Sequence, residues 1–209
     1  GIAKGTHNIG RAVSIAGDEQ GPTKNTYIAR ELTEHPLTQR FGGVERIMGG
    51  TRRLPVKLTA ANAEIPFRFI PHFPDLPMEE IYAREPASDP AVIAREFPGG
   101  GRVVYFPWNI GEIFWEVLNL DHSILLDNAL RWALRDVPRV EVEGLGIVDI
   151  AVRESDTRLS VHLVNLSNPM MMKGPIRDVI PLSGQSVSVA LPQGRSATVR
   201  LLVSGEIPK

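Results

Sequence analysis

The 209-residue chain contains no cysteine. This absence excludes disulfides, thiolate metal sites and thiol nucleophiles, although it says little about the compartment. The longest apolar runs fall well short of the roughly 20 residues that a membrane-spanning helix needs. The net charge is −1, so electrostatics give no reason to expect nucleic acid or an anionic membrane as a partner. No signal peptide is visible, and because the sequence starts at Gly1, an upstream one stays open.

The sequence also lacks the common motifs of catalysis and cofactor binding. No G-x-S-x-G elbow is present, as a serine hydrolase would need. Gly99–Gly101 leads into a strand pattern and does not open a helix, so no phosphate-binding loop is expected. The five histidines show neither HxH nor HExxH spacing, so we expect no metal and no cofactor. They are His7, His35, His72, His122 and His162.

The clearest local pattern is a strand followed by a helix. Arg102–Phe106 reads as a buried strand, and Gly99–Gly101 as a tight turn that pairs it antiparallel with Ile93–Phe97. A loop over residues 108–119 then leads to a helix that begins at Asp121 or Ser123, two good N-caps, and runs to Leu134. This is one strand–helix unit of a layered α/β domain.

The segment before this unit is harder to assign. Residues 26–30, 54–58 and 65–69 read as short strands, whereas residues 1–22 are polar and glycine-rich and resemble an entry segment. Residues 66–98 carry seven prolines. Because proline interrupts helices and central strands, we expect a long irregular loop there, either at an interface or as a plain surface loop.

From Arg139 onward the apolar residues recur with a period of two. Four strands are expected, at residues 148–152, 159–163, 187–191 and 199–203, separated by turn residues. This pattern predicts a small antiparallel β-sandwich or barrel. The chain is therefore expected to divide into residues 1–137, an α/β domain, and residues 138–209, a small antiparallel β domain.

Several phrases resemble a known family. "GRVVYFPWNIGEIFW" (101–115), "LLDNALRWAL" (125–134) and "PHFPDLP" (71–77) are similar to the β-galactosidase trimerisation domain of family 42-type glycoside hydrolases. That domain has a flavodoxin-like fold, also called class I glutamine amidotransferase-like. "VHLVNLSNPMMMKG" (161–174) resembles the terminal module of related glycoside hydrolases.

The resemblance implies a partial flavodoxin-like α/β domain, with its first strands upstream of residue 1 or missing, followed by a small β-sandwich. It implies a non-catalytic C-terminal module that supports an upstream catalytic barrel or forms a homo-oligomer, a trimer or a dimer. Amidotransferase activity is excluded because there is no cysteine nucleophile. A catalytic barrel of about 250 residues does not fit in this chain, so we expect no enzyme here.

Seven residues are candidates for lining a ligand or an interface: Tyr82, Trp108, Asn109, Glu112, Trp115, Glu116 and Met171. Carboxylates beside tryptophans can form a sugar subsite, and residues 108–119 follow a strand end, where α/β folds tend to place ligands. The alternative is that Trp115 simply packs within the fold or at an interface. Met171 belongs to a run of three methionines that suits either an interface or the junction between the two domains.

A carbohydrate-binding module is the alternative function. It would use exposed aromatic side chains, such as Tyr82, Trp108 and Trp115, to stack against sugar rings. Residues 139–209 contain no aromatic residue, which counts against sugar binding by the second domain. Nothing positive in the sequence supports a third option, an enzyme with unrecognised chemistry.

Overall fold

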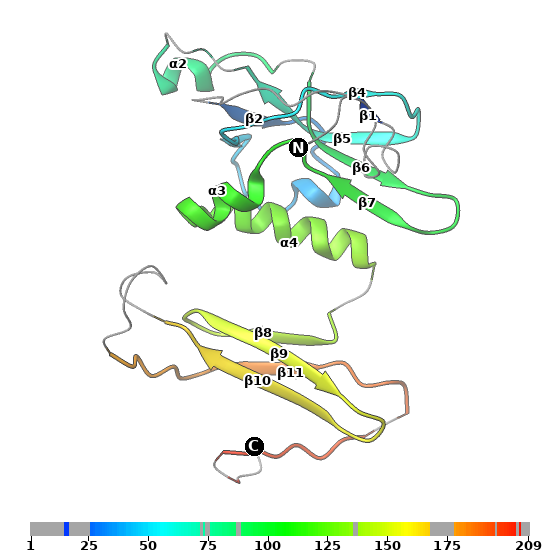
Figure 1. Cartoon of the computed structure of the whole chain (residues 1–209), viewed down its shortest axis with the longest axis vertical. Coiled ribbons are helices and arrows are strands. Elements are labelled where there is room, and N and C mark those ends of the chain that lie inside the picture. Colours follow the sequence, from blue (N-terminus) through cyan, green and yellow to red (C-terminus); the bar gives the residue numbers. More distant parts are fainter. Residues whose placement is uncertain are drawn as a thin grey trace. The chain divides into compact units, whose positions relative to one another are not determined.

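The structure, a computed structural model, describes residues 15–16, 26–71, 73, 76–86, 89–135, 138–167, 178–194, 196–203 and 205. The chain forms two compact units, Gly1–Asp136 and Val137–Lys209 (Figure 1). The fold is mixed and rich in antiparallel sheet, with 19% of the described residues in helices and 32% in strands.

A five-stranded sheet organises unit 1. Its strands lie in the order β3-β2-β5-β6-β7, and every neighbouring pair is antiparallel. Their bounds are β2 Tyr27–Arg30, β3 Arg46–Met48, β5 Ala63–Ile70, β6 Pro90–Glu96 and β7 Arg102–Tyr105. A second, two-stranded sheet pairs β1 Ile15–Ala16 with β4 Lys57–Leu58.

Two helices cover one face of the five-stranded sheet, α3 Ile110–Val117 and α4 Leu120–Leu134 (Figure 1). Two shorter elements are the 3₁₀ helix η1 Pro36–Thr38 and helix α2 Met78–Tyr82. The main core lies between sheet and helices, where Ile28, Phe67 and Phe69 of the strands meet Leu125 of α4 and Trp108. Each side chain of this core is more than nine-tenths buried, so the helices are packed onto the sheet.

The flavodoxin-like layering that the resemblance implies is not confirmed. A flavodoxin-like sheet is parallel, and parallel neighbours need crossover connections of a dozen or more residues. Only residues 97–101 join β6 to β7, and Gly100, at φ +88°, closes that turn with a hydrogen bond from its N–H to the carbonyl of Phe97. So short a connection produces a hairpin, which is antiparallel.

The prediction of one long proline-rich loop over residues 66–98 is wrong. Pro66 lies within β5, and Pro90 is the first residue of β6. Pro66 lies where β5 changes register against β6, between Glu64 and Phe67, and opposite Glu31, one residue beyond the end of β2. Its missing N–H therefore falls outside the β2–β5 ladder. The Pro66 carbonyl instead accepts a hydrogen bond from the Glu31 N–H at 2.8 Å.

The predicted hairpin and the final helix of unit 1 are confirmed, with two corrections. Residues 110–117, expected as a loop, form helix α3. The N-cap of α4 is Asn119 and not Asp121 or Ser123, since the Asn119 Oδ1 accepts from the Asp121 N–H at 2.8 Å. The expected loop is helical because Ile110 and Ile113, three residues apart, are both buried.

Unit 2 consists of two antiparallel ribbons. One pairs β8 Val140–Glu143 with β11 Ser186–Val189, and the other pairs β9 Val148–Glu154 with β10 Leu159–Asn165. Valines face valines across the first ribbon, in the pairs Val142–Val187 and Val140–Val189, while Glu141 and Glu143 lie opposite serines. Each ribbon therefore has one apolar face and one largely polar face, as the period of two predicts.

The predicted fourth strand of unit 2, at residues 199–203, is absent, and β8 is a strand that the period-two analysis missed. Among the described residues of unit 2 none is fully buried, and Ile150, Val152 and Leu163 stay exposed. The described part therefore shows two separate two-stranded sheets, without the buried core that defines a β-sandwich.

Among the described residues, no helix is both long enough and apolar enough to cross a membrane.

The packing of α4 onto the sheet gives the first prediction. Leu125 is fully buried in the main core, so Leu125→Ala removes apolar contacts and leaves a cavity. We expect a loss of about 2–5 kcal/mol in the free energy of unfolding, measured by urea denaturation. The control is Val44→Ala in the same unit, which is exposed and should change stability by less than about 0.5 kcal/mol. Equal effects of the two substitutions would contradict this packing.

Candidate functional site

Two segments far apart in sequence run side by side at the end of β7. The Leu54 N–H donates to the Pro107 carbonyl at 2.7 Å, and the Asn109 N–H donates to the Arg52 carbonyl at 3.3 Å. Between them, Arg53 forms an isolated antiparallel bridge with Trp108. Residues 50–54 and 107–109 therefore form one connected corner, called here the Trp108 corner.

Asn109 holds this corner together with its side chain. Its Oδ1 accepts from the backbone N–H groups of Thr51 and Arg52, at 3.1 and 3.0 Å. Its Nδ2 donates to the Thr51 Oγ1 at 3.0 Å and to the Glu112 Oε2 at 2.8 Å. Because the amide is used in this way, it does not cap α3, although Asn109 occupies the N-cap position. Asn109 thus has a structural role in joining the two segments.

Trp108 is buried beneath the corner. Its Nε1 donates to the Ala91 carbonyl at 2.9 Å, and its ring meets the His122 ring edge to face at 5.5 Å. His122 is also fully buried, and its Nε2 lies 2.9 Å from the Met48 carbonyl. Since a carbonyl can only accept, this Nε2 carries the proton. Trp108 and His122 therefore anchor the corner to the core.

Gly50 allows the close approach of the two segments. A Cβ atom at this position would lie 2.5 Å from the Asn109 Oδ1 and 2.7 Å from the Trp108 Cε3. Both distances are shorter than real Cβ contacts, so a larger residue would force the segments apart. The glycine is needed here for space.

A pocket of about 260 Å³ opens at the corner. One wall consists of residues 52–54 and the other of residues 105–109. The Arg53 side chain is only 14% exposed, its Nη1 lies 3.3 Å from the Asp89 Oδ2, and its guanidinium lies 5.2 Å from the centre of the Phe69 ring. The pocket therefore combines aromatic and aliphatic walls with a partly buried cation.

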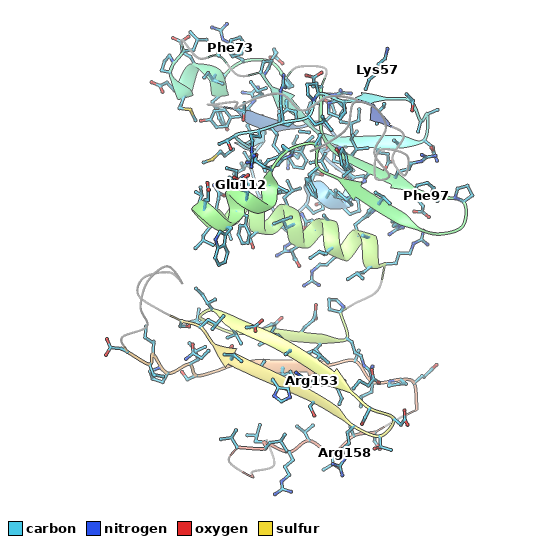
Figure 2. All side chains as sticks on the ribbon, viewed as in Figure 1. Lys57, Phe73, Phe97, Glu112, Arg153 and Arg158 are labelled. Atoms are coloured by element: carbon cyan, nitrogen blue, oxygen red, sulfur yellow. The ribbon has the colours of Figure 1, made fainter. Side chains whose placement is uncertain are left out.

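Glu112 lies in the first turn of α3 (Figure 2), where it contacts Arg52 and Asn109 of the pocket lining. The hydrogen bond from Asn109 and the hydrogen bond and charge of Arg52 lower the pKa of Glu112. A general acid at neutral pH needs a raised pKa, so the shift runs opposite to what acid catalysis requires. Glu112 is best described as an ionised, exposed ion-pair partner of Arg52.

The chain matches no known family model, no curated protein and no solved structure. The site is therefore defined by its geometry alone.

The structure brings together only some of the residues expected from the sequence. Trp108, Asn109 and Glu112 meet at the corner, whereas Trp115 and Glu116 lie further along α3 and line no described pocket. Tyr82, at the end of α2, stacks edge to face with Tyr27 at 5.3 Å and under the guanidinium of Arg46 at 5.5 Å. Met171 lies outside the described residues.

The sequence analysis missed Arg52 and Arg53. The available signal was the run Gly49-Gly50-Thr51-Arg52-Arg53, in which two glycines that allow close packing are followed, after one residue, by two cations. The partner segment lies about 57 residues away, and nothing local connects the two.

From the spacing of the five histidines we expect no metal site. In the part of the chain that the structure describes, no three His, Asp or Glu side chains gather as a metal site would need. His35 donates from Nε2 toward Glu64 at 3.1 Å and accepts from the Leu37 N–H at Nδ1. Burial lowers the pKa of His35 despite the neighbouring carboxylate. His7 and His72 lie outside the described residues.

A second, wider hollow of about 670 Å³ is lined by four glutamates together with His35 and Trp132. Its carboxylates are largely held in ion pairs. Glu64 pairs with His35, and Glu96 pairs with Arg102 at 2.9 Å and with Arg135. These contacts give the acidic residues a structural role, since Glu64 accepts from the buried His35 and Glu96 pairs with two arginines.

The corner gives a prediction for Gly50. Gly50→Ala should lower the free energy of unfolding by about 1–3 kcal/mol, because the new methyl group overlaps Asn109 and Trp108. The control is Gly111→Ala in α3, where a Cβ meets nothing within 4 Å. That change should stabilise by roughly 0.5–1 kcal/mol through helix propensity. Thermal denaturation of both variants measures these changes in stability. An unchanged stability of Gly50→Ala would show that the two segments are not in close contact.

A second prediction concerns the titration of Glu112. The folded pKa lies below the unfolded one, so the stabilisation from ionised Glu112 is present above the unfolded pKa and is lost as the pH falls through the folded value. Arg52 and Asn109 both lower the pKa of Glu112. Arg52→Gln removes the contribution of Arg52 and should therefore move the Glu112 midpoint upward in an NMR pH titration. The midpoint of Asp127, which pairs with Arg40 and Arg131, should stay unchanged. An unmoved Glu112 midpoint would refute the ion pair.

Proposed function

We propose that this chain is a non-catalytic structural module that self-associates through exposed apolar side chains of α3 and α4. The carrying observation is a set of large apolar side chains exposed on these two helices. They are Trp115, Val117, Leu120, Leu130 and Leu134, with exposed fractions between 52% and 71%. We call this set the helical patch.

The pattern of α4 explains why the helical patch is unusual. Its inner face is already satisfied by burial of Leu125 and Ala129 against the sheet. The outer face, where a surface helix normally carries polar residues, still has Leu120, Leu130 and Leu134. Positions 120, 130 and 134 fall within about 80° of one another around a helix of 3.6 residues per turn. An exposed apolar stripe of this kind marks a protein interface.

Charge around the patch favours association between identical copies. Asp127 lies on the same outer face and pairs with Arg131 at 3.0 Å and with Arg40. These pairs leave the rim polar without a dominant sign, and the whole chain carries only −1. Copies of the chain therefore have little electrostatic repulsion to overcome on contact. A stable homo-oligomer would bury roughly 2,000 Å² or more in total.

The sequence resemblance supports a more specific version of the proposal. In that version the chain is the C-terminal region of a glycoside hydrolase-like protein, and the patch joins subunits that each carry an upstream catalytic barrel. Unit 1 would then be the last part of a flavodoxin-like layered domain. The helix layer on one sheet face fits this relationship, while the antiparallel pairing of the described strands counts against it.

The alternative function, a carbohydrate-binding module, needs exposed aromatic rings, and two of its three candidates are engaged within the fold. Trp108 is buried and hydrogen-bonded, and Tyr82 is engaged by Tyr27 and Arg46. Of the three aromatic residues, only Trp115 exposes more than half of its surface. One exposed ring does not form a stacking platform for an extended sugar.

The proposal predicts concentration-dependent assembly, measured by sedimentation equilibrium. The unmodified chain should form a dimer or trimer, and Leu130→Glu should weaken assembly by roughly tenfold or more, because it places a charge within the apolar contact. The control is Leu145→Glu in unit 2, at a leucine that is 85% exposed outside the helical patch. It should assemble as the unmodified chain does.

A monomer at all concentrations would overturn the proposal. Equal weakening by Leu130→Glu and Leu145→Glu would also overturn it, since the contact would then not be the helical patch.

A further inference from the structure

We infer that the pocket at the Trp108 corner binds a small monocarboxylate with an apolar body, through the guanidinium of Arg53. This inference is independent of the proposed self-association, since it concerns a different surface of unit 1. It rests on the hydrogen-bonding state of Arg53, on the walls of the pocket and on its charge balance.

Arg53 has hydrogen-bonding capacity that the described residues leave unused. Its Nε and Nη1 are buried and make no hydrogen bond within the described part of the chain. Asp89 approaches Nη1 to 3.3 Å, close enough for an ion pair but without hydrogen-bond geometry. Buried polar groups are almost always satisfied, and an unsatisfied guanidinium is costly. An acceptor that enters the pocket and reorients this side chain would recover that cost.

The rest of the lining selects the body of the ligand. Leu54, Phe106, Pro107 and Trp108 provide aliphatic and aromatic walls. Tyr105 adds a phenol whose pKa is raised by burial, so its hydroxyl stays protonated and can donate. A ligand with an acceptor at one end and a compact apolar group at the other matches this division, as small-molecule sites usually do.

The charge balance argues against a doubly charged ligand. Arg52 is paired with Glu112, and Arg53 lies beside Asp89. With each guanidinium already near one carboxylate, the site lacks the surplus of positive charge that a phosphate dianion would need. A planar carboxylate suits the guanidinium fork and carries only one charge.

The walls are also held in place before any ligand arrives. The backbone hydrogen bonds between residues 52–54 and 107–109, together with the Asn109 side chain, fix both sides of the pocket. A preformed pocket of this kind does not require the ligand to order a loop, which lowers the cost of binding.

The test uses benzoate, its neutral isostere benzamide and inorganic phosphate. Binding to the full chain is followed by the indole N–H signals of the three tryptophans in NMR titrations. Benzoate should shift the Trp108 signal and leave the Trp115 signal unchanged. It should bind roughly tenfold or more tightly than benzamide or phosphate, because only benzoate combines one charge with an apolar body.

Variants connect the binding to Arg53. Arg53→Gln should weaken benzoate binding by roughly tenfold or more, and Arg53→Lys, which keeps the charge beside Asp89 but loses the fork, should have a smaller effect. The control Arg158→Gln, in the turn between β9 and β10, should bind benzoate normally (Figure 2). Leu130→Glu should also bind benzoate normally, which separates this inference from the self-association proposal.

Three results would overturn the inference. They are no shift of the Trp108 signal up to roughly 10 mM benzoate, equal binding of benzoate and benzamide, or tighter binding of phosphate. The dispersed NMR spectrum shows which of the variants Arg53→Gln and Arg53→Lys is folded. An unchanged affinity of a folded variant for benzoate would place the ligand elsewhere.

Discussion

The close contact of Gly50 with Trp108 and Asn109 is the constraint on which most of unit 1 depends. It brings a segment before β5 against the segment that follows β7, and the Asn109 side chain connects them through three hydrogen bonds to Thr51 and Arg52. Trp108, directly before Asn109, extends this connection into the core through Ala91 and His122. The same contact starts α3 at Ile110 and fixes both walls of the pocket.

Because the corner positions α3, it also determines which surface the helices leave outside. Helix α4 follows α3 after two residues and packs on the sheet with Leu125 and Ala129. Its outer leucines then have no partner within the helix layer and stay exposed. The two surfaces that carry our proposals, the pocket and the helical patch, thus arise from one structural arrangement, although they consist of different residues and involve different chemistry.

Local signals account for what could be predicted from the sequence. The glycine turn at 99–101 specified the β6–β7 hairpin, and the apolar spacing from Leu125 to Leu134 specified α4. The flavodoxin-like layering is not confirmed and the long proline-rich loop was wrong, since strand pairing and the register shift beside Pro66 depend on contacts between distant segments. The pocket was only half predictable for the same reason. Trp108 and Asn109 stand out in the sequence, but Arg53 gains its role only through a segment more than 50 residues away.

The most direct test of the central claim, that the helical patch is buried between copies of the chain, follows the solvent exposure of Trp115. The protein is labelled with fluorotryptophan, and the fluorine shift difference between H₂O and D₂O is measured for each tryptophan across a range of protein concentrations. The account predicts that Trp115 loses this difference as the concentration rises, while Trp108 shows little at any concentration. A Trp115 that keeps its full solvent shift at the highest concentration would contradict it.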